Sequence, residues 1–241
     1  MPTLMKAVLF DLDGTLLDLD GDAFLEDYVS RLTKEIHLCW PGIKFQEALW
    51  TAAVGALAQP HPGRTNRDVI LASLSQSLTI DPLALWARID HFNRTRVGEV
   101  LPGGTPCPHA REVVTHVQAM GYQIALATTP IYDWPVVKER LRRAQLADIR
   151  WNLVTTDQFC STKPYPTYYT DIANRLGVPV EACMMVGDDA FNDLAASVTG
   201  MATYYVGQTF PGLTVGNSGP LSGLTSRLTM MSGISSIQRQ F

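Results

Sequence analysis

Short apolar runs and helical patterns alternate along most of the chain. Five runs of four or five largely apolar residues, at 7–10, 123–127, 151–155, 182–186 and 202–206, predict buried β-strands. Between the later runs, apolar residues recur at helical spacing over 110–120, 134–147 and 167–176. Strands that alternate with helices are typical of a parallel sheet with helices on both faces. The pattern therefore predicts an α/β fold.

The stretch from residue 19 to 97 is different, because it carries only helical patterns. Breaks at Pro41-Gly42, at residues 60–63 and at Asp81-Pro82 divide it into four predicted helices. This pattern predicts a core domain made of residues 1–18 and 98–241, with a helical domain, residues 19–97, inserted after the first strand.

Several helix ends can also be predicted. We expect Asp22 to cap the first helix of the insertion, Thr65 to stand at the start of the third, and Asp81 to cap the fourth. After residue 207 the chain is rich in Gly, Ser and Thr, and a short helix is expected over 221–228. Beyond Thr229 we expect disorder or loose packing.

Composition argues against several classes of protein. The net charge of −4 gives no electrostatic footprint for nucleic acid or an anionic membrane. Four cysteines are scattered without a CxxC pair, which favours free thiols in the cytoplasm. No run approaches the ~20 apolar residues of a membrane span, and the first run is too short for a signal peptide. We expect a cytoplasmic monomer or homodimer without nucleic-acid or membrane partners.

Candidate chemistry begins where the first apolar run ends, at Asp11, Asp13 and Gly14. Alternate residues of a strand point to the same side, so both carboxylates would face one site if the strand geometry continued. Ligands of open α/β sheets bind beyond the carboxyl ends of the strands. A divalent cation there would bind both carboxylates and relieve their repulsion.

The segment Asp11-Leu12-Asp13-Gly14-Thr15-Leu16 resembles motif I of the haloacid dehalogenase-like hydrolase superfamily. Three further segments resemble the family's other motifs, in the family's order and each after a predicted strand. They are Thr128-Thr129 as motif II, where Asn is common at the second position, Lys163-Pro164-Tyr165-Pro166 as motif III, and the acidic loop from Gly187 to Asp193 as motif IV.

This resemblance implies a Rossmann-like core with strand order 3-2-1-4-5, a helical cap and a Mg²⁺-dependent phosphohydrolase. Asp11 would attack phosphorus and form an aspartyl-phosphate, and Asp13 would act as general acid and base. The phosphoryl group would be held by Thr128, Thr129 and Lys163. The metal would be held by Asp11, the backbone carbonyl of Asp13, and Asp188. Asp189 and Asp193 are further metal ligands, direct or through water, or orient the lysine.

Other interpretations of the same motifs stay open. A phosphomutase of the superfamily would keep all four motifs, and a non-catalytic phosphate- or partner-binding relative is a third possibility. Asp13 argues against a dehalogenase, because the dehalogenase branch lacks the second aspartate of motif I. We expect a small phosphate ester as substrate, with Arg64 and Asn66 of the cap as candidate specificity residues.

Overall fold

The computed structural model describes residues 4–209, 213 and 215–237. Its main sheet has five parallel strands in the order β5 (Leu153–Val154), β4 (Gln123–Leu126), β1 (Ala7–Phe10), β6 (Cys183–Gly187) and β7 (Ala202–Tyr205). In chain order this is 3-2-1-4-5, so the predicted topology is confirmed. The central strand β1 is paired on both edges, with Phe10 opposite Leu126 and Val186.

Both faces of the sheet are buried, because alternate residues of β1 belong to two different hydrophobic clusters. Val8 and Phe10 pack with residues of α5 (Ala110–Ala119), α6 (Trp134–Arg143) and α8 (Leu224–Ile237). Ala7 and Leu9 pack with residues of α7 (Pro166–Leu176) on the other face. A short 3-10 helix, Leu194–Thr199, follows β6 on that same face. The continuous apolar character of β1 is therefore that of a doubly covered parallel strand.

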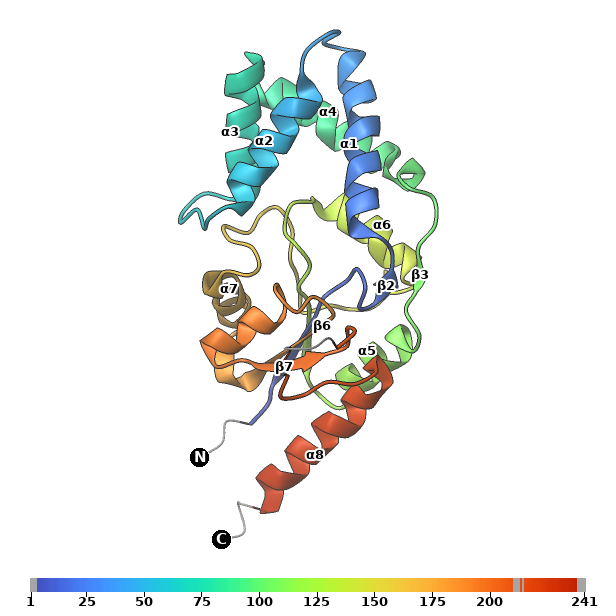
Figure 1. The fold of residues 1–241 in the computed structure, drawn as a ribbon, viewed down its shortest axis with the longest axis vertical. Helices are drawn as coiled ribbons and strands as arrows, with labels where there is room; N and C mark the ends of the chain where they lie inside the picture. Colours follow the sequence, from blue (N-terminus) through green and yellow to red (C-terminus); the bar gives the residue numbers. More distant parts are fainter. Residues whose placement is uncertain (1–3, 210–212, 214, 238–241) are drawn as a thin grey trace.

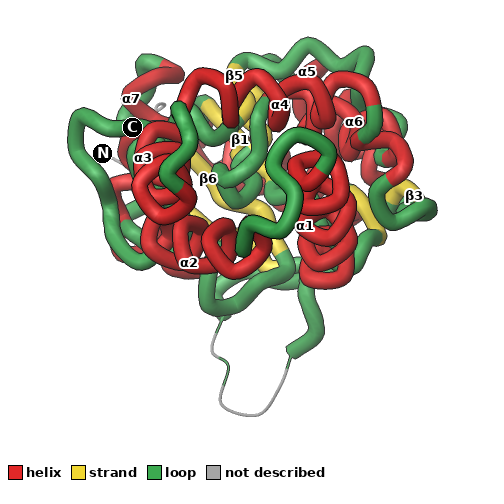
Figure 2. Tube along the Cα trace, turned by 90° about the horizontal axis from the view of Figure 1, so that it is seen from above, coloured by secondary structure: helices red, strands yellow, loops and turns green. Residues whose placement is uncertain are grey.

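Four helices stand together above the sheet (Figure 1). They are α1 (Gly21–His37), α2 (Phe45–Leu57), α3 (Asn66–Leu78) and α4 (Pro82–Thr95). A two-stranded antiparallel pair, β2 (Leu17–Asp18) with β3 (Thr105–Pro106), lies where the chain leaves the core for these helices and where it returns. Viewed from above, the four helices lie over the core and strands β1, β5 and β6 are seen between them (Figure 2). Helix α8 extends from the opposite end of the core (Figure 1). We call this four-helix unit the cap.

The start of α1 corrects one prediction. Asp20, and not Asp22, is the N-cap, because its Oδ1 accepts hydrogen bonds from the backbone N–H groups of Asp22 and Ala23 at 3.1 and 3.0 Å. The helix begins one residue after Asp20, so Asp22 lies inside the first turn. There its charge is placed favourably at the positive end of the helix dipole.

The other two predicted starts are confirmed. Thr65 caps α3 in a capping box with Asp68, and Asp81 caps α4 by accepting from the N–H of Ala84. In both cases a short polar side chain satisfies a backbone donor that the helix itself leaves without a partner.

The end of the chain corrects a second prediction. After a 3-10 turn at Leu221–Gly223, α8 continues to Ile237, past the point at which we expected loose packing. Leu228 is buried and Met231 packs against the core, so the helix is anchored beyond its first turn. Residues 238–241, which fell in the same prediction, lie outside the described residues.

Within the described part of the chain, no single helix has the length and apolar content to cross a membrane. Helices α3 and α4 reach that length and apolar content only when they are taken together, and their axes are bent by 117° at the break between them.

Candidate active site

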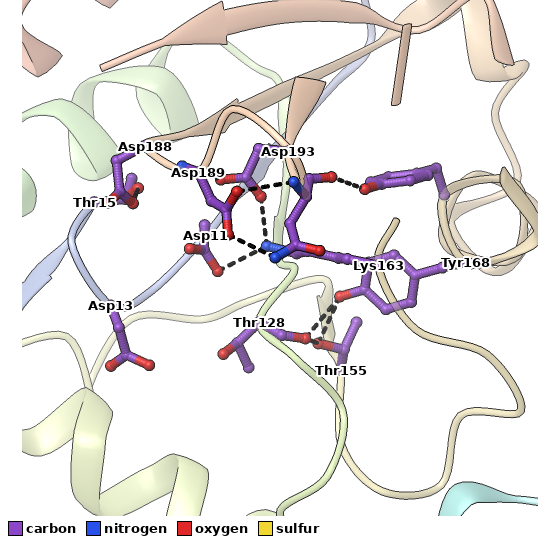
Figure 3. A network of polar contacts seen from close by, with 12 residues as sticks. Asp11, Asp13, Thr15, Thr128, Thr155, Lys163, Tyr168, Asp188, Asp189 and Asp193 are labelled. Atoms are coloured by element: carbon purple, nitrogen blue, oxygen red, sulfur yellow. Dashed lines mark hydrogen bonds and ion pairs between the residues drawn. The ribbon is translucent and has the colours of Figure 1, made fainter. Parts of the chain in front are cut away.

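The parallel register brings three of the four motifs to one edge of the sheet. Asp11 follows β1, Thr128 comes shortly after β4, and Asp188 follows β6. The N–H of Asp11 donates to the carbonyl of Val186 at 2.9 Å, which ties the first motif to the strand that carries the fourth. Lys163, from the loop before α7, completes the group drawn in Figure 3.

Three carboxylates converge at this edge. Asp11, Asp188 and Asp193 each offer an oxygen, and these three oxygens lie within 4.8 Å of one another. Asp188 is also held by the hydroxyl of Thr15, which donates to its Oδ1 at 2.7 Å. Gly14 makes this approach possible: its φ is +76°, and a Cβ there would lie 2.1 Å from Oδ2 of Asp188.

Lys163 is buried between two of these carboxylates. Its Nζ donates to Oδ1 of Asp11 at 2.8 Å and to Oδ1 of Asp193 at 2.6 Å. Burial alone would lower the pKa of Lys163, but the charges of Asp11 and Asp193 outweigh it and raise the pKa. The ammonium is therefore fixed in its charged form beside Asp11.

The charges of the group suit a divalent cation. Three carboxylates and one ammonium leave two negative charges when all are ionised. Burial and the charge of Asp11 raise the pKa of Asp188, although the hydroxyl of Thr15 opposes the shift. A cation would offset this accumulated charge, and a donor set made only of oxygen atoms favours Mg²⁺ over zinc.

Motif II is held by side chains that the sequence did not identify. The backbone carbonyl of Thr128 accepts hydrogen bonds from the hydroxyls of Thr155 and Tyr168, each at 2.8 Å. Both donors are buried, and Tyr168 also donates to Thr155. These two hydrogen bonds therefore fix the backbone of the loop that carries Thr128 and Thr129. For Thr155, its position at the end of a predicted strand could have indicated a place near the site. For Tyr168, the sequence showed only helical periodicity.

Asp13 lies near the group, but its carboxylate points away from Asp11 (Figure 3). It pairs with the buried Arg140 of α6, whose Nε donates to Oδ1 at 3.2 Å and whose Nη2 contacts Oδ2. Sequence reasoning missed Arg140. Its signal was positional, because it stands four residues after Val136 and therefore on the buried stripe of an amphipathic helix.

Asp189 and Asp193, the two carboxylates of the acidic loop whose roles were left open, make different contacts. Asp193 enters the site: Oδ1 accepts from Lys163 and Oδ2 accepts from the N–H of Asp189 at 3.0 Å. Asp189 turns into its own loop, where it accepts from the N–H groups of Phe191 and Asn192 and from the Asn192 side chain. Asp193 therefore contacts Lys163 directly, whereas Asp189 is bound within its own loop.

The two candidate specificity residues of the cap differ in position. Asn66 is buried, and its side-chain Nδ2 donates to the carbonyls of Pro130 and Ser161 at 3.0 and 3.3 Å. Its neighbour Arg67 forms a bidentate pair with Asp157 of the core. Both interactions dock the cap onto the loops of motifs II and III.

Arg64 is exposed and lies just before α3, and its guanidinium donates to the carbonyl of Asp68 in the first turn of that helix at 3.4 Å. A role in specificity for either residue stays a prediction.

Comparison with known proteins places these motifs in context. The family model of the haloacid dehalogenase-like hydrolases matches residues 5–198. The phosphorylated carbohydrates phosphatase of Thermotoga maritima is 29% identical, over 83% of this chain and 84% of that protein. A phosphoglycolate phosphatase of Vibrio vulnificus is 28% identical, over 83% and 82%. Among solved structures, the 2-haloacid dehalogenase of Pseudomonas syringae shares the fold with a TM-score of 0.63 and 20% identity, over 94% of this chain and 99% of that chain.

Proposed function

Since the chain belongs to the haloacid dehalogenase-like hydrolases, we propose that it is a Mg²⁺-dependent phosphatase that hydrolyses a small phosphate monoester through an aspartyl-phosphate on Asp11. The observation that carries the proposal is the ion pair of Asp11 with the buried Lys163, at 2.8 Å, within a group of three converging carboxylates. The similar proteins of Thermotoga maritima and Vibrio vulnificus, which are named as phosphatases, support the same reaction class.

The first step is an in-line attack. A carboxylate oxygen of Asp11 forms a bond to phosphorus while the bond from phosphorus to the ester oxygen breaks, and Asp13 supplies the proton to the departing alkoxide. Lys163 and the hydroxyl of Thr128 hold the phosphoryl oxygens. Lys163 keeps its charge in this setting, which suits an electrostatic role.

The second step returns the enzyme to its starting state. Water attacks the phosphorus of the aspartyl-phosphate, Asp13 takes a proton from it, and inorganic phosphate leaves as the Asp11 carboxylate is restored. The pairing of Asp13 with Arg140 requires the carboxyl group to turn towards the substrate during the cycle.

The oxygen donors fit a metal at the same place. Asp11, Asp188 and the backbone carbonyl of Asp13 would hold Mg²⁺, which when bound supplies charge stabilisation for phosphoryl transfer. Asp193 would orient Lys163, whose Nζ lies 2.6 Å from its Oδ1. The preference for a small substrate is supported by the cap, which is docked over the carboxyl edge of the sheet through Asn66 and Arg67.

Hydrolysis of an aryl phosphate by the full chain tests the proposal. We expect activity with Mg²⁺ that EDTA removes, a phosphorylated Asp11 peptide in the acid-quenched enzyme, and loss of both in Asp11→Asn. The matched control is Asp171→Asn, because Asp171 pairs with Arg175 on the surface of α7. Near wild-type turnover by Asp11→Asn would contradict the assigned nucleophile. Isomerisation of a sugar phosphate without phosphate release would point to a phosphomutase instead.

A further inference from the structure

A cavity of about 70 Å³ lies between the four cap helices and two core segments, residues 131–133 and Asp157. Its walls are large apolar side chains that are only partly buried: Leu25, Leu49, Trp50, Ile70, Leu71 and Trp86. The lining includes none of the proposed phosphoryl-binding residues. Tyr132 separates the two places, since it lines the cavity and its ring also lies 5.2 Å from the guanidinium of Arg140.

One charged pair in the lining is already satisfied. Arg67 donates to both oxygens of Asp157, at 2.7 and 2.8 Å, and its guanidinium lies 4.0 Å from the centre of the Trp86 ring. A bidentate pair of this kind neutralises both members and fixes their geometry. Arg67 is therefore already paired with a carboxylate of the protein.

The other carboxylate of the lining, Asp133, is only partly satisfied. Its side chain is 3% exposed, and its Oδ1 accepts only a long hydrogen bond of 3.4 Å from the N–H of Val136. Its Oδ2 has no hydrogen-bond partner within the described residues. A buried acceptor without a partner is costly, and an unpaired buried charge more so.

The ionisation of Asp133 leaves the cavity with one unbalanced negative charge. Burial raises the pKa of Asp133 to about 6, although the side-chain amide of Asn93 beside it opposes the shift, so the carboxylate is charged above neutral pH. The nearby amide of Asn93 accepts a hydrogen bond from Tyr28 at 2.9 Å, and neither residue carries a positive charge. The cavity therefore has apolar walls and a single anionic acceptor.

We propose that this cavity binds a small apolar molecule that carries a protonated amine, with the ammonium group at Asp133 and the apolar body among the cap side chains. An anion is disfavoured by the two carboxylates of the lining. A metal ion is disfavoured because Arg67 occupies both oxygens of Asp157. The volume of about 70 Å³ suits a compact body rather than a long chain.

Paired probes of the same shape test the proposal on the full chain. Thermal unfolding and calorimetric titration would compare butylamine with butanol at about pH 8, where an alkyl amine with a pKa of about 10.4 is protonated. The amine should raise Tm with concentration and bind at least about tenfold more tightly than the alcohol, as expected for a hydrogen bond to a charged group.

Three variants separate the causes. Asp133→Asn should bring the amine and the alcohol to similar affinity. Asp90→Asn is the control, because Asp90 pairs with Arg94 outside the cavity, and it should leave the preference for the amine unchanged. Ala53→Leu, which places a larger side chain in the cavity, should weaken binding of both probes. Equal affinity for amine and alcohol in the wild type, or an amine preference that survives Asp133→Asn, would overturn the proposal. Binding must also persist in Asp11→Asn, so the result is independent of the phosphatase assignment.

Discussion

The guanidinium of Arg140 pairs with the carboxylate of Asp13, with Nε 3.2 Å from Oδ1. The arginine is buried between two aromatic rings, Phe24 of the cap and Tyr132 of the core, at 5.6 and 5.2 Å from their centres. The side chain proposed to protonate the leaving group is therefore anchored beside the site by a residue from α6 that also contacts the cap, and its carboxyl group turns from this resting position towards the substrate. Within the described residues Nη1 of Arg140 has no hydrogen-bond partner, so Asp13 is its main charged contact.

Loss of this pair should impair the proposed acid rather than the nucleophile. Asp13→Asn is expected to slow an alkyl phosphate about 10²–10⁴-fold more than a nitrophenyl phosphate, because the nitrophenolate leaves without a proton. Arg140→Met should lower the same alkyl-to-aryl ratio of kcat/KM by about tenfold or more. The double variant should have a ratio no lower than that of Asp13→Asn alone, since the two residues act as a unit.

The control for this cycle is Arg143→Met. Arg143 is buried one turn further along α6 and donates to the carbonyls of Val100 and Leu101, not to Asp13. Its loss should lower stability and reduce both substrates in proportion. If Arg140→Met also reduced both substrates in proportion, Arg140 would have a structural role only.

Gly14 should control the metal site through its missing side chain. Gly14→Ala places a Cβ 2.1 Å from Oδ2 of Asp188 and must displace that carboxylate. The expected result is a rise of about 10–100-fold in the Mg²⁺ concentration that gives half-maximal activity, which is the range seen when groups supporting a metal ligand are altered.

The matched control is Gly42→Ala. Gly42 has nearly the same φ, +78° against +76°, but a Cβ there meets nothing within 4 Å. Both variants carry the strain of a left-handed backbone, about 1–2 kcal/mol, and Gly14→Ala should lose more stability than Gly42→Ala because it also displaces Asp188. A similar Mg²⁺ requirement in the two variants would mean that Asp188 does not hold the metal.

The fold was readable from the sequence because its signals are local. The apolar run of β1 and the residues that follow it specify a buried strand with polar groups at its end, and strand order followed from the resemblance to a known family. Arg140 and Tyr168 were missed because their roles depend on which helix faces reach the site, and helical periodicity shows only that a position is buried. Asp22 was chosen over Asp20 as a cap because both have the right chemistry, and only the backbone geometry separates them.

Asn66 should act in docking of the cap. Asn66→Ala removes two hydrogen bonds to core carbonyls and leaves the carbonyls of Pro130 and Ser161 without this donor, which should lower the free energy of unfolding by about 1–3 kcal/mol. Arg64→Ala is the control, because Arg64 is exposed before α3 and its guanidinium contacts only the carbonyl of Asp68 among the described residues, and its effect should stay within about 0.5 kcal/mol.

The same two variants separate docking from specificity. A docking residue should change kcat and stability while the ranking of phosphorylated substrates stays the same, as measured on a panel of sugar phosphates and phosphorylated acids. A changed ranking in Asn66→Ala at unchanged stability would instead support its role as a specificity residue.

The buried carboxylate of Asp133 should make the protein less stable as the pH rises. Its pKa is raised by burial from 3.8 to about 6, so between these values the folded state holds a proton that the unfolded state has lost. Stability therefore falls as the pH rises through this window, and the loss is complete above about pH 6. At about 1.4 kcal/mol per pKa unit, the loss amounts to about 2–3 kcal/mol.

Asp133→Asn removes this loss, because an amide cannot ionise and asparagine is also a good N-cap. Chemical denaturation should find the variant similar to the wild type near pH 4 and more stable by about 2 kcal/mol near pH 7. Asp81→Asn, the same change at the exposed N-cap of α4, should not gain stability with pH. If Asp133→Asn were less stable than the wild type at neutral pH, the charge of Asp133 would be compensated within the protein, and the cavity beside it would have no need of a cationic ligand.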